Sequence, residues 1–167
     1  MTDMHLAEFN IGTLKYDWED PRIADFLNNL DRVYGIAERS PGYVWHLSGD
    51  DMEAEQLDQG GVLGGNPRTA STLSVWRDAA SLEQFTFNTV HKQFYDRKDE
   101  WYDPAEQAWD GHRLVMWYVA PGHRPSVAEA VDRLTHLIEH GDTDFAFGWK
   151  YLSNATLWQT KQCGRAA

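Results

Sequence analysis

Seven residues, Arg113–Val119 (RLVMWYV), place the tightest constraint on how this chain folds. The segment has the length of a β-strand, and its branched and aromatic residues favour that conformation. Successive side chains of a strand point to opposite faces of a sheet, and here both sets are apolar. A strand with no polar face is covered on both sides. The sequence therefore predicts a sheet in which this strand is shielded from water on each face.

Three further segments, His5–Ile11, Tyr43–Leu47 and Thr72–Trp76, alternate in the manner of half-buried strands. A segment with helical periodicity lies between His5–Ile11 and Tyr43–Leu47, and another lies between Thr72–Trp76 and Arg113–Val119. One more helical segment follows Arg113–Val119. The predicted order is strand, helix, strand, strand, helix, strand and an added C-terminal helix. We therefore expect an α+β fold with ferredoxin-like βαββαβ topology, an antiparallel sheet and helices on one of its faces.

Capping residues mark where the first and last helices begin. Asp20 is a favoured N-cap, and it is followed by Pro21, whose ring suits the first helical position. Ser126 and Glu129 have the spacing of a capping box, in which two side chains satisfy free N–H groups of the first turn. We expect helices to start at both places.

The middle helix carries apolar side chains on two sides. Asp78 or Ser81 suits its N-cap, and one apolar stripe follows over Leu82–Thr89. At 100° per residue, the opposite side carries Phe87, His91 and Phe94. A helix with apolar groups on both sides is buried on both sides or lines a cavity. One side of this helix is therefore a candidate cavity wall.

The length of 167 residues suits a single domain, 1–167. We expect its core over about residues 5–151, with Phe145–Tyr151 docked on the body and a flexible tail over about 153–167. The two helices of the βαββαβ plan cover one face of the sheet, and little of the chain is left to cover the other. A monomer would then expose several large apolar side chains in one continuous patch, and such patches are rare in monomers. We therefore predict a homodimer in which two sheets pack face to face.

The connection Ser48–Thr69 is acidic and then rich in glycine, and it has no clear periodicity. A connection of this length without secondary structure is uncommon in a compact domain and is often functional or mobile. We predict a mobile loop that borders the pocket or the dimer interface. A solvated hairpin loop and a lid over the pocket are its two alternatives.

Charge and composition exclude several classes of partner. The net charge of −11 argues against nucleic acid and against an anionic membrane surface, because both attract basic proteins. No apolar stretch is long enough to span a membrane, and Met1–Asn10 lacks the pattern of a signal peptide. The one cysteine, Cys163, permits no intrachain disulfide, which fits a reducing compartment. We expect a cytoplasmic protein.

An aromatic-rich composition of eight Trp, seven Tyr and seven Phe favours an apolar pocket as well as a large core. We predict a pocket between the helices and the sheet for a hydrophobic or aromatic small molecule. Its predicted lining residues, around His91, are Asn10, Trp45, His46, Trp76, Phe87, Phe94 and Trp117. The chain has no glycine-rich phosphate loop, serine elbow or cysteine–histidine pair, which argues against nucleotide-dependent and acyl-transfer chemistry.

His91 is the predicted catalytic residue, with His46 and His123 next in order. Imidazole exchanges protons near neutral pH and is the commonest metal ligand, so a histidine among aromatic residues suits an acid, base or ligand. The alternative is a hydrogen-bonded histidine of the core or of an interface. His136 and His140 have the spacing of a metal pair, but no third ligand is near them in the sequence. We predict a solvated surface there and no metal site.

Short motifs along the chain resemble a bacterial family known only as a domain of unknown function. The motifs are NIG at 10–12, ERSPGYVWHL at 38–47, LSVW at 73–76, SLEQF at 81–85 with a following His91, PGHRP at 121–125, EAVDRL at 129–134 and FAF at 145–147, together with Arg97, Trp101 and Trp117. The resemblance covers about Leu6–Tyr151. It implies a dimeric α/β barrel, the superfamily of the antibiotic-biosynthesis monooxygenases. It implies no particular reaction.

A more distant resemblance concerns haem. The segment VWRDAASLEQFTFNTVHKQF is similar to the strand and helix of haem-degrading members of that superfamily, in which a histidine late in the second helix is the axial ligand. The resemblance implies that His91 holds this place. Because the superfamily also includes cofactor-free oxygenases, isomerases, dye peroxidases and chlorite dismutases, the fold does not select a chemistry.

Two classes of function remain open. In the first, the chain is a small monooxygenase-like oxidoreductase or an isomerase that acts on a hydrophobic or aromatic molecule, with haem bound through His91 as one alternative. In the second, it is a homodimer that binds a small molecule or has a structural role, without turnover.

Overall fold

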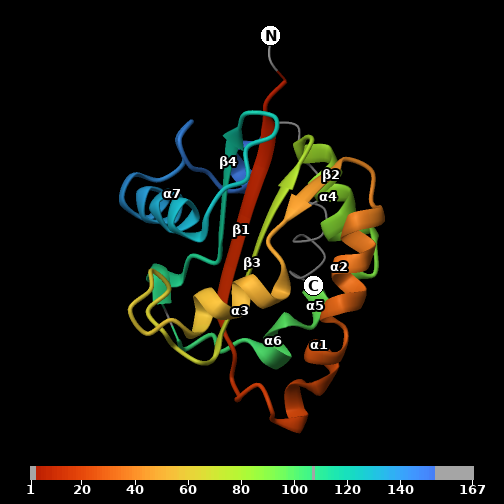
Figure 1. Ribbon diagram of the computed structural model, residues 1–167, viewed down its shortest axis with the longest axis vertical. Helices are drawn as coiled ribbons and strands as arrows, with labels where there is room; N and C mark the ends of the chain where they lie inside the picture. Colours follow the sequence, from red (N-terminus) through yellow and green to blue (C-terminus); the bar gives the residue numbers. More distant parts are fainter. Residues whose placement is uncertain (1–2, 107, 153–167) are drawn as a thin grey trace, which may run out of the picture.

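A computed structural model describes residues 3–106 and 108–152. Four strands form an antiparallel sheet at its centre, in the order β2-β3-β1-β4 (Figure 1). The strands are β1 (His5–Thr13), β2 (Tyr43–His46), β3 (Thr69–Trp76) and β4 (Leu114–Val119). The α+β class and the antiparallel sheet are therefore confirmed, and each strand overlaps the segment predicted for it.

Helices fill the connections between the strands. Between β1 and β2 lie η1 (Pro21–Ile23), α1 (Ala24–Asn28) and α2 (Leu30–Arg39), and between β2 and β3 lies α3 (Gly49–Leu57). Between β3 and β4 lie α4 (Ala79–Asn88), α5 (His91–Asp96), α6 (Lys98–Trp101) and η2 (Ala108–Gly111). After β4 come α7 (Val127–His140) and η3 (Trp149–Tyr151).

The predicted helix starts are confirmed by their caps. The carboxylate of Asp20 accepts a hydrogen bond from the N–H of Arg22, and the hydroxyl of Ser126 accepts one from the N–H of Glu129. The carboxylate of Asp78 caps α4. These caps form between residues close in sequence, which is why local patterns predict them well.

The prediction of an unstructured Ser48–Thr69 segment is wrong, because α3 forms within it. Met52 and Gln56, one turn apart, are its buried residues, and the amide oxygen of Gln56 accepts hydrogen bonds from the N–H (2.8 Å) and hydroxyl (2.9 Å) of Ser71. The helix thus closes the edge of β3 beyond the short strand β2. Because only two positions of this acidic segment are buried, its apolar periodicity is too weak to predict a helix from the sequence.

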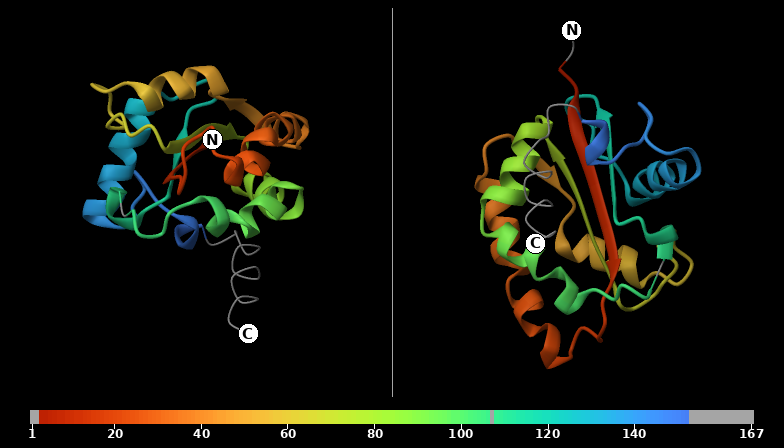
Figure 2. Two further views of the ribbon diagram at one scale, coloured as in Figure 1. Left: turned by 90° about the horizontal axis from the view of Figure 1, so that it is seen from below. Right: turned by 180° about the vertical axis from the view of Figure 1, so that it is seen from behind.

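One face of the sheet, here called the closed face, is filled by apolar side chains. The strands contribute Ala7, Phe9, Ile11, Leu73, Val75, Val115, Trp117 and Val119, and α7 packs on them with Val127, Ala130, Leu134 and Leu137. Figures 1 and 2 show α7 on this side of the sheet and α2, α4 and α5 on the other. The prediction that one face lies uncovered is therefore wrong, since the added helix covers it.

Strand β4 is covered fully on the closed face and in part on the other face, where Met116 is buried but Tyr118 is exposed, so the prediction of cover on both faces holds only in part. Val115 and Trp117 face α7, while Met116 faces the other way and is fully buried with Phe147. Phe147 and Met116 exchange two backbone hydrogen bonds of 2.8 and 2.9 Å, which confirms that Phe145–Tyr151 docks on the body. The reason given for a face-to-face dimer is thus removed. The homodimer itself stays a prediction, and the tail predicted over 153–167, with Cys163, lies outside the described residues.

A candidate ligand cavity

The second face of the sheet, here called the hollow face, has a polar centre. Its central side chains are Leu6, Glu8 and Asn10 from β1 and Thr72, Ser74 and Trp76 from β3, and the register pairs Glu8 with Ser74 and Asn10 with Thr72. Packing a helix directly on polar side chains costs free energy unless each polar group keeps a hydrogen-bond partner. A cavity lies over this polar centre.

The cavity has two adjoining lobes that share several lining residues, among them Asn10, Tyr34 and His91. The main lobe has a volume of about 360 Å³ and the side lobe about 310 Å³. Aromatic rings form much of the wall, chiefly Phe26, Tyr34, Trp76, Phe85, Phe94 and Trp101. We call both lobes together the ligand cavity. Residues of α3 border its side lobe, so the Ser48–Thr69 segment borders the cavity as predicted; its mobility stays a prediction.

A hydrogen-bond network holds the carboxylate of Glu8 on the cavity floor. The amide nitrogen of Asn10 donates to Glu8 Oε1 (2.7 Å) and to Thr72 Oγ1 (2.5 Å). The Ser74 hydroxyl donates to Glu8 Oε2 (3.0 Å) and accepts from the indole Nε1 of Trp76 (3.0 Å). Both carboxylate oxygens are therefore fixed by neutral donors.

Burial sets the proton affinity of Glu8. It raises the pKa of this carboxyl to about 7, because removal from water disfavours the charged form more than the Asn10 and Ser74 hydrogen bonds favour it. A carboxyl group with this pKa gives and takes protons at neutral pH, as a general acid or base requires.

A tyrosine and a histidine flank Glu8 at the β2 side of the cavity. The pKa of Tyr34 is raised to about 12, mainly by burial and to a smaller extent by the negative charges of Glu8 and Asp31. The Tyr34 hydroxyl therefore stays a neutral donor. The Tyr34 ring stacks on His46 with a centroid distance of 4.6 Å. His46 Nδ1 donates to the carbonyl of Leu47 (2.8 Å), and Nε2 lies 3.0 Å from Glu38 Oε1. Both His46 nitrogens therefore already have partners.

His91 reaches the cavity because the predicted continuous helix is broken. Helix α4 ends at Asn88, Thr89 is extended (φ −118°, ψ −175°), and α5 begins at His91. The Thr89 hydroxyl accepts the N–H of His91 (3.2 Å) and donates to the carbonyl of Phe85 (2.6 Å). Such side-chain bonds offer the backbone an alternative to the helix. His91 is thus the first residue of a short helix, not a late residue of a long one.

The imidazole of His91 is held in one tautomer. Its Nδ1 donates to the carbonyl of Thr86 (3.0 Å), which leaves the lone pair on Nε2. Burial lowers the pKa of His91, and the Thr86 bond opposes this more weakly. The neutral ring can therefore serve as a base or a metal ligand through Nε2.

The structure gathers some of the predicted lining residues and separates others. Asn10, His46, Trp76 and Phe94 line the cavity together with His91. Trp45, Trp117 and Phe87 do not line either lobe.

Strand alternation and the helix break explain these exclusions. Trp45 pairs with Val75 and packs on the closed face, where Trp117 also lies with its indole Nε1 donating to Glu129 (3.0 Å). Phe87 packs against Tyr95 and Trp149 instead, because Leu82, Phe85 and Thr86 form the cavity side of α4. His123 is exposed and lies 2.8 Å from Glu129, at the start of α7. The face of α4 predicted to line the pocket was therefore the wrong one.

A family model described as a domain of unknown function, DUF3291, matches residues 5–163. The chain belongs to this family. No curated protein matches the chain.

Two solved structures are similar to the chain at low sequence identity. A conserved protein from Methanosarcina mazei Go1 is 12% identical with a TM-score of 0.45, over 71% of this chain and 94% of the other. A protein of unknown function from Nitrosomonas europaea is 11% identical with a TM-score of 0.43, over 75% of this chain and 97% of the other. Neither similarity identifies a reaction. Among the helices of residues 3–106 and 108–152, none combines the length and the hydrophobicity that a membrane-spanning helix needs.

The predicted lining omits several polar residues of the cavity, among them Glu8, Tyr34, Thr72 and Ser74. A signal for three of them was available. Polar residues at alternate positions of two predicted central strands place a polar cluster on one sheet face, which a packed face would not tolerate. No such signal was available for Tyr34, because this residue lies within a stripe of apolar residues at helical spacing.

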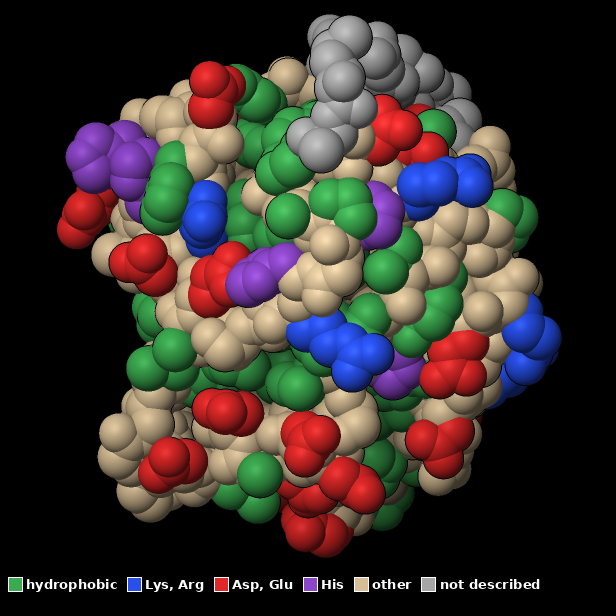
Figure 3. Space-filling view, turned by 45° about the horizontal axis from the view of Figure 1, so that its top comes forward, with side chains coloured by type: hydrophobic (Ala, Val, Ile, Leu, Met, Phe, Trp, Pro, Cys, Tyr) green, Lys and Arg blue, Asp and Glu red, His purple; other side chains and the backbone are tan. Residues whose placement is uncertain are grey.

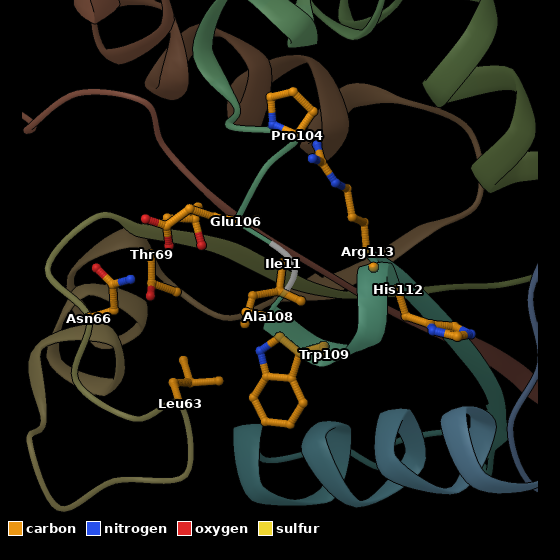
Figure 4. A pocket seen from close by; sticks show the side chains of 13 residues that line it. Ile11, Leu63, Asn66, Thr69, Pro104, Glu106, Ala108, Trp109, His112 and Arg113 are labelled. Atoms are coloured by element: carbon orange, nitrogen blue, oxygen red, sulfur yellow. The ribbon is translucent and has the colours of Figure 1, made fainter.

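A second, smaller cavity of about 160 Å³ lies at the far end of β1 (Figure 4). Figure 4 shows Asn66, Thr69 and Glu106 around one space beside Ile11, and Glu106 accepts from Arg68 (2.7 Å). Its volume is less than half that of the main lobe, so it does not suit an aromatic ligand of the predicted kind.

Proposed function

We propose that this family member binds a hydrophobic or aromatic small molecule in the ligand cavity. The observation that carries the proposal is the aromatic wall around one buried polar centre, the usual composition of a small-molecule site. The wall supplies apolar contact area, while Glu8, Asn10 and Tyr34 orient the polar part of the ligand.

An enzymatic role is the second part of the proposal. Glu8 and His91 line the same lobe, and both suit proton transfer near neutral pH. Isomerisation by proton transfer begins with removal of a proton, as does cofactor-free oxygenation of an acidic aromatic compound through its anion. A monooxygenase-like or isomerase activity is thus the favoured form, and a binding protein without turnover is the alternative. An otherwise intact His91→Ala variant should lose on the order of 10²–10⁴ in turnover if His91 is the acid or base.

A cavity-filling variant tests the binding proposal. We expect 2-naphthylmethanol to change the tryptophan fluorescence of the protein, because Trp76 and Trp101 line the cavity. Thr86→Trp should abolish this change by filling the main lobe.

Thr135→Trp is its matched control. Like Thr86, Thr135 is a helical threonine whose hydroxyl donates to the carbonyl four residues earlier (2.8 Å in both), but it is exposed on α7. Equal binding by both variants would refute the cavity as the site.

Haem is a second candidate because of one contact of His91. The Nδ1 bond to the Thr86 carbonyl is the kind of outer interaction that orients a metal-binding histidine, and Nε2 carries the lone pair. Lys98 and Arg113 line the same lobe and have the charge that suits haem propionates. Bound haem would supply redox chemistry with oxygen.

Hemin titration separates this candidate from the first. A sharp Soret band that His91→Ala weakens or shifts would support haem ligation. A colourless purified protein that gives no such band with hemin would exclude it and leave the cofactor-free proposal standing.

A ferredoxin-like assignment and a homodimer complete the proposal. The strand order β2-β3-β1-β4, with α2 after β1 and α4 after β3, supports the ferredoxin-like plan. With the closed face filled, we place the dimer interface at the exposed aromatic side chains Tyr118 (42%), Phe145 (39%) and Tyr151 (37%) beside β4. Sedimentation equilibrium at micromolar concentration tests it, and a monomer there would contradict it.

A further inference from the structure

Glu8 is a buried carboxylate without a counter-charge. Its side-chain partners, Asn10 and Ser74, are neutral, and no Lys or Arg in the described part of the chain forms an ion pair with it. Buried charges in proteins are normally paired, because an isolated charge in an apolar site is costly. Below its pKa of about 7, Glu8 is neutral and needs no counter-charge. Once ionised, it has no positive partner in the described part of the chain, and a cationic group on a ligand would supply one.

The two cationic side chains of the cavity have partners elsewhere. The Lys98 ammonium lies over the Tyr95 ring, 4.7 Å from its centroid. The Arg113 guanidinium donates to the carbonyl of Asp103 (3.4 Å) and lies over the Tyr102 ring. The pKa of Glu8 is shifted by burial and, in the opposite direction, by its hydrogen bonds to the two neutral donors Asn10 and Ser74.

On this basis, and resting on the proposed function of the cavity, we propose that its ligand is an organic cation: an amine on an apolar or aromatic body, whose ammonium group pairs with Glu8. Each carboxylate oxygen accepts one bond from the protein and has a further lone pair for an ammonium N–H. The Asn10 and Ser74 donors hold the carboxylate in place for this bond.

The surroundings of Glu8 favour a cation over an anion or a neutral ligand. Aromatic faces attract cations, and Tyr34, Trp76 and Phe85 all line the lobe that contains Glu8. Figure 3 shows acidic side chains spread across one face of the molecule, and the net charge of −11 raises the local concentration of cations. An anionic ligand would place a second negative charge in the same apolar space.

A metal ion is a poorer occupant than an amine. Metal sites in proteins combine several ligands, and residues 3–106 and 108–152 contain no group of three or more His, Cys, Asp and Glu side chains that could hold one. One carboxylate within an aromatic wall suits a single ammonium group with an apolar body.

Matched probes test the inference. We compare 2-naphthylmethylamine, 2-naphthylmethanol and 2-naphthoate at about pH 8, where Glu8, with a pKa of about 7, is mostly ionised. We expect the amine to bind more tightly than the alcohol, and the carboxylate to bind most weakly. Glu8→Gln should weaken amine binding about 30-fold or more. It should weaken alcohol binding much less, because the amide oxygen of Gln still accepts a hydrogen bond from the hydroxyl.

Two more variants make the result specific. Glu8→Asp keeps the charge and should retain a preference for the amine. Glu83→Gln removes another buried glutamate, which lies in α4 and lines neither lobe, and should leave all three affinities unchanged.

The outcomes separate the two proposals. Equal binding of amine and alcohol, or a preference for naphthoate, would overturn the cation inference and leave the small-molecule function standing. Failure of all three probes to bind would overturn both. An amine preference that survives Glu8→Gln would also overturn the assignment to Glu8.

Discussion

The two faces of the sheet differ in what their helices do. On the closed face, Phe9, Val75 and Trp117 form one apolar cluster with residues of α7, and a hydrogen bond from the Trp117 indole to Glu129 is added at its edge. On the hollow face, Glu8 and Ser74 occupy the middle of the same strands, and the helices leave a cavity of about 360 Å³ above them. The same backbone thus carries a packed core on one side and a candidate site on the other.

The difference shows how a strand serves stability and function at once. Alternation sends Ala7 and Phe9 to the closed face and Glu8 and Asn10 to the hollow face. Burial of apolar side chains on the closed face stabilises the sheet. This stabilisation offsets the free-energy cost of burying the Glu8 carboxylate on the hollow face. Variants on the two faces should therefore have separable effects on stability and binding.

The largest expected loss of stability comes from Trp117→Ala on the closed face. Trp117 is fully buried against α7, and removing a buried Trp costs roughly 3–5 kcal/mol. Denaturant unfolding measures the loss. Binding of 2-naphthylmethanol per folded molecule should not change.

Trp76→Ala is its counterpart on the hollow face. Trp76 is equally buried but borders the cavity and stacks on Phe85 at 5.0 Å. We expect this variant to lose both stability and probe affinity. If Trp117→Ala changed affinity as much as Trp76→Ala, the two faces would not be functionally distinct.

A pH-dependent effect of intermediate size is expected for Glu8→Gln. The folded pKa of Glu8, about 7, lies above its ordinary value of 4.5, so the folded state binds more protons than the unfolded state between these values. The Glu8 contribution to stability is therefore present at low pH and is lost as pH rises towards 7 and above. The total loss amounts to about 3 kcal/mol.

Unfolding of both proteins over about pH 4.5–8 measures this difference. As pH rises, the free energy of unfolding of the wild type should fall more than that of Glu8→Gln, by up to about 3 kcal/mol. Parallel pH curves for the two proteins would show that Glu8 keeps an ordinary pKa.

Helix caps give the smallest expected effects. Ser126→Ala and Asp78→Ala each remove the side chain that accepts the first-turn N–H of α7 and α4, and each should cost about 1 kcal/mol. Because α4 borders the cavity and α7 does not, Asp78→Ala should weaken probe binding and Ser126→Ala should not. Thermal unfolding with fluorescence titration checks both, and a binding loss in Ser126→Ala would contradict the separation.

Local patterns in the sequence determined the strands, the helix caps and the apolar character of both faces of β4. These features depend on residues within a few positions of one another: an Asp before a Pro, a Ser three residues before a Glu, or apolar residues in unbroken succession. They also predicted an aromatic pocket on the helical side of the sheet and placed Asn10, His46, Trp76, His91 and Phe94 in it.

Tertiary structure alone decided which face is closed and which is hollow. The packing of α7 on the closed face joins residues more than a hundred positions apart, and the bond from Gln56 to Ser71 that anchors α3 is likewise non-local. The turn at Thr89 brings His91 to the cavity, although helical periodicity continues past it. The proton affinity of Glu8 comes from burial beneath helices distant in sequence, because desolvation depends on what surrounds a group in space and not on its neighbours along the chain.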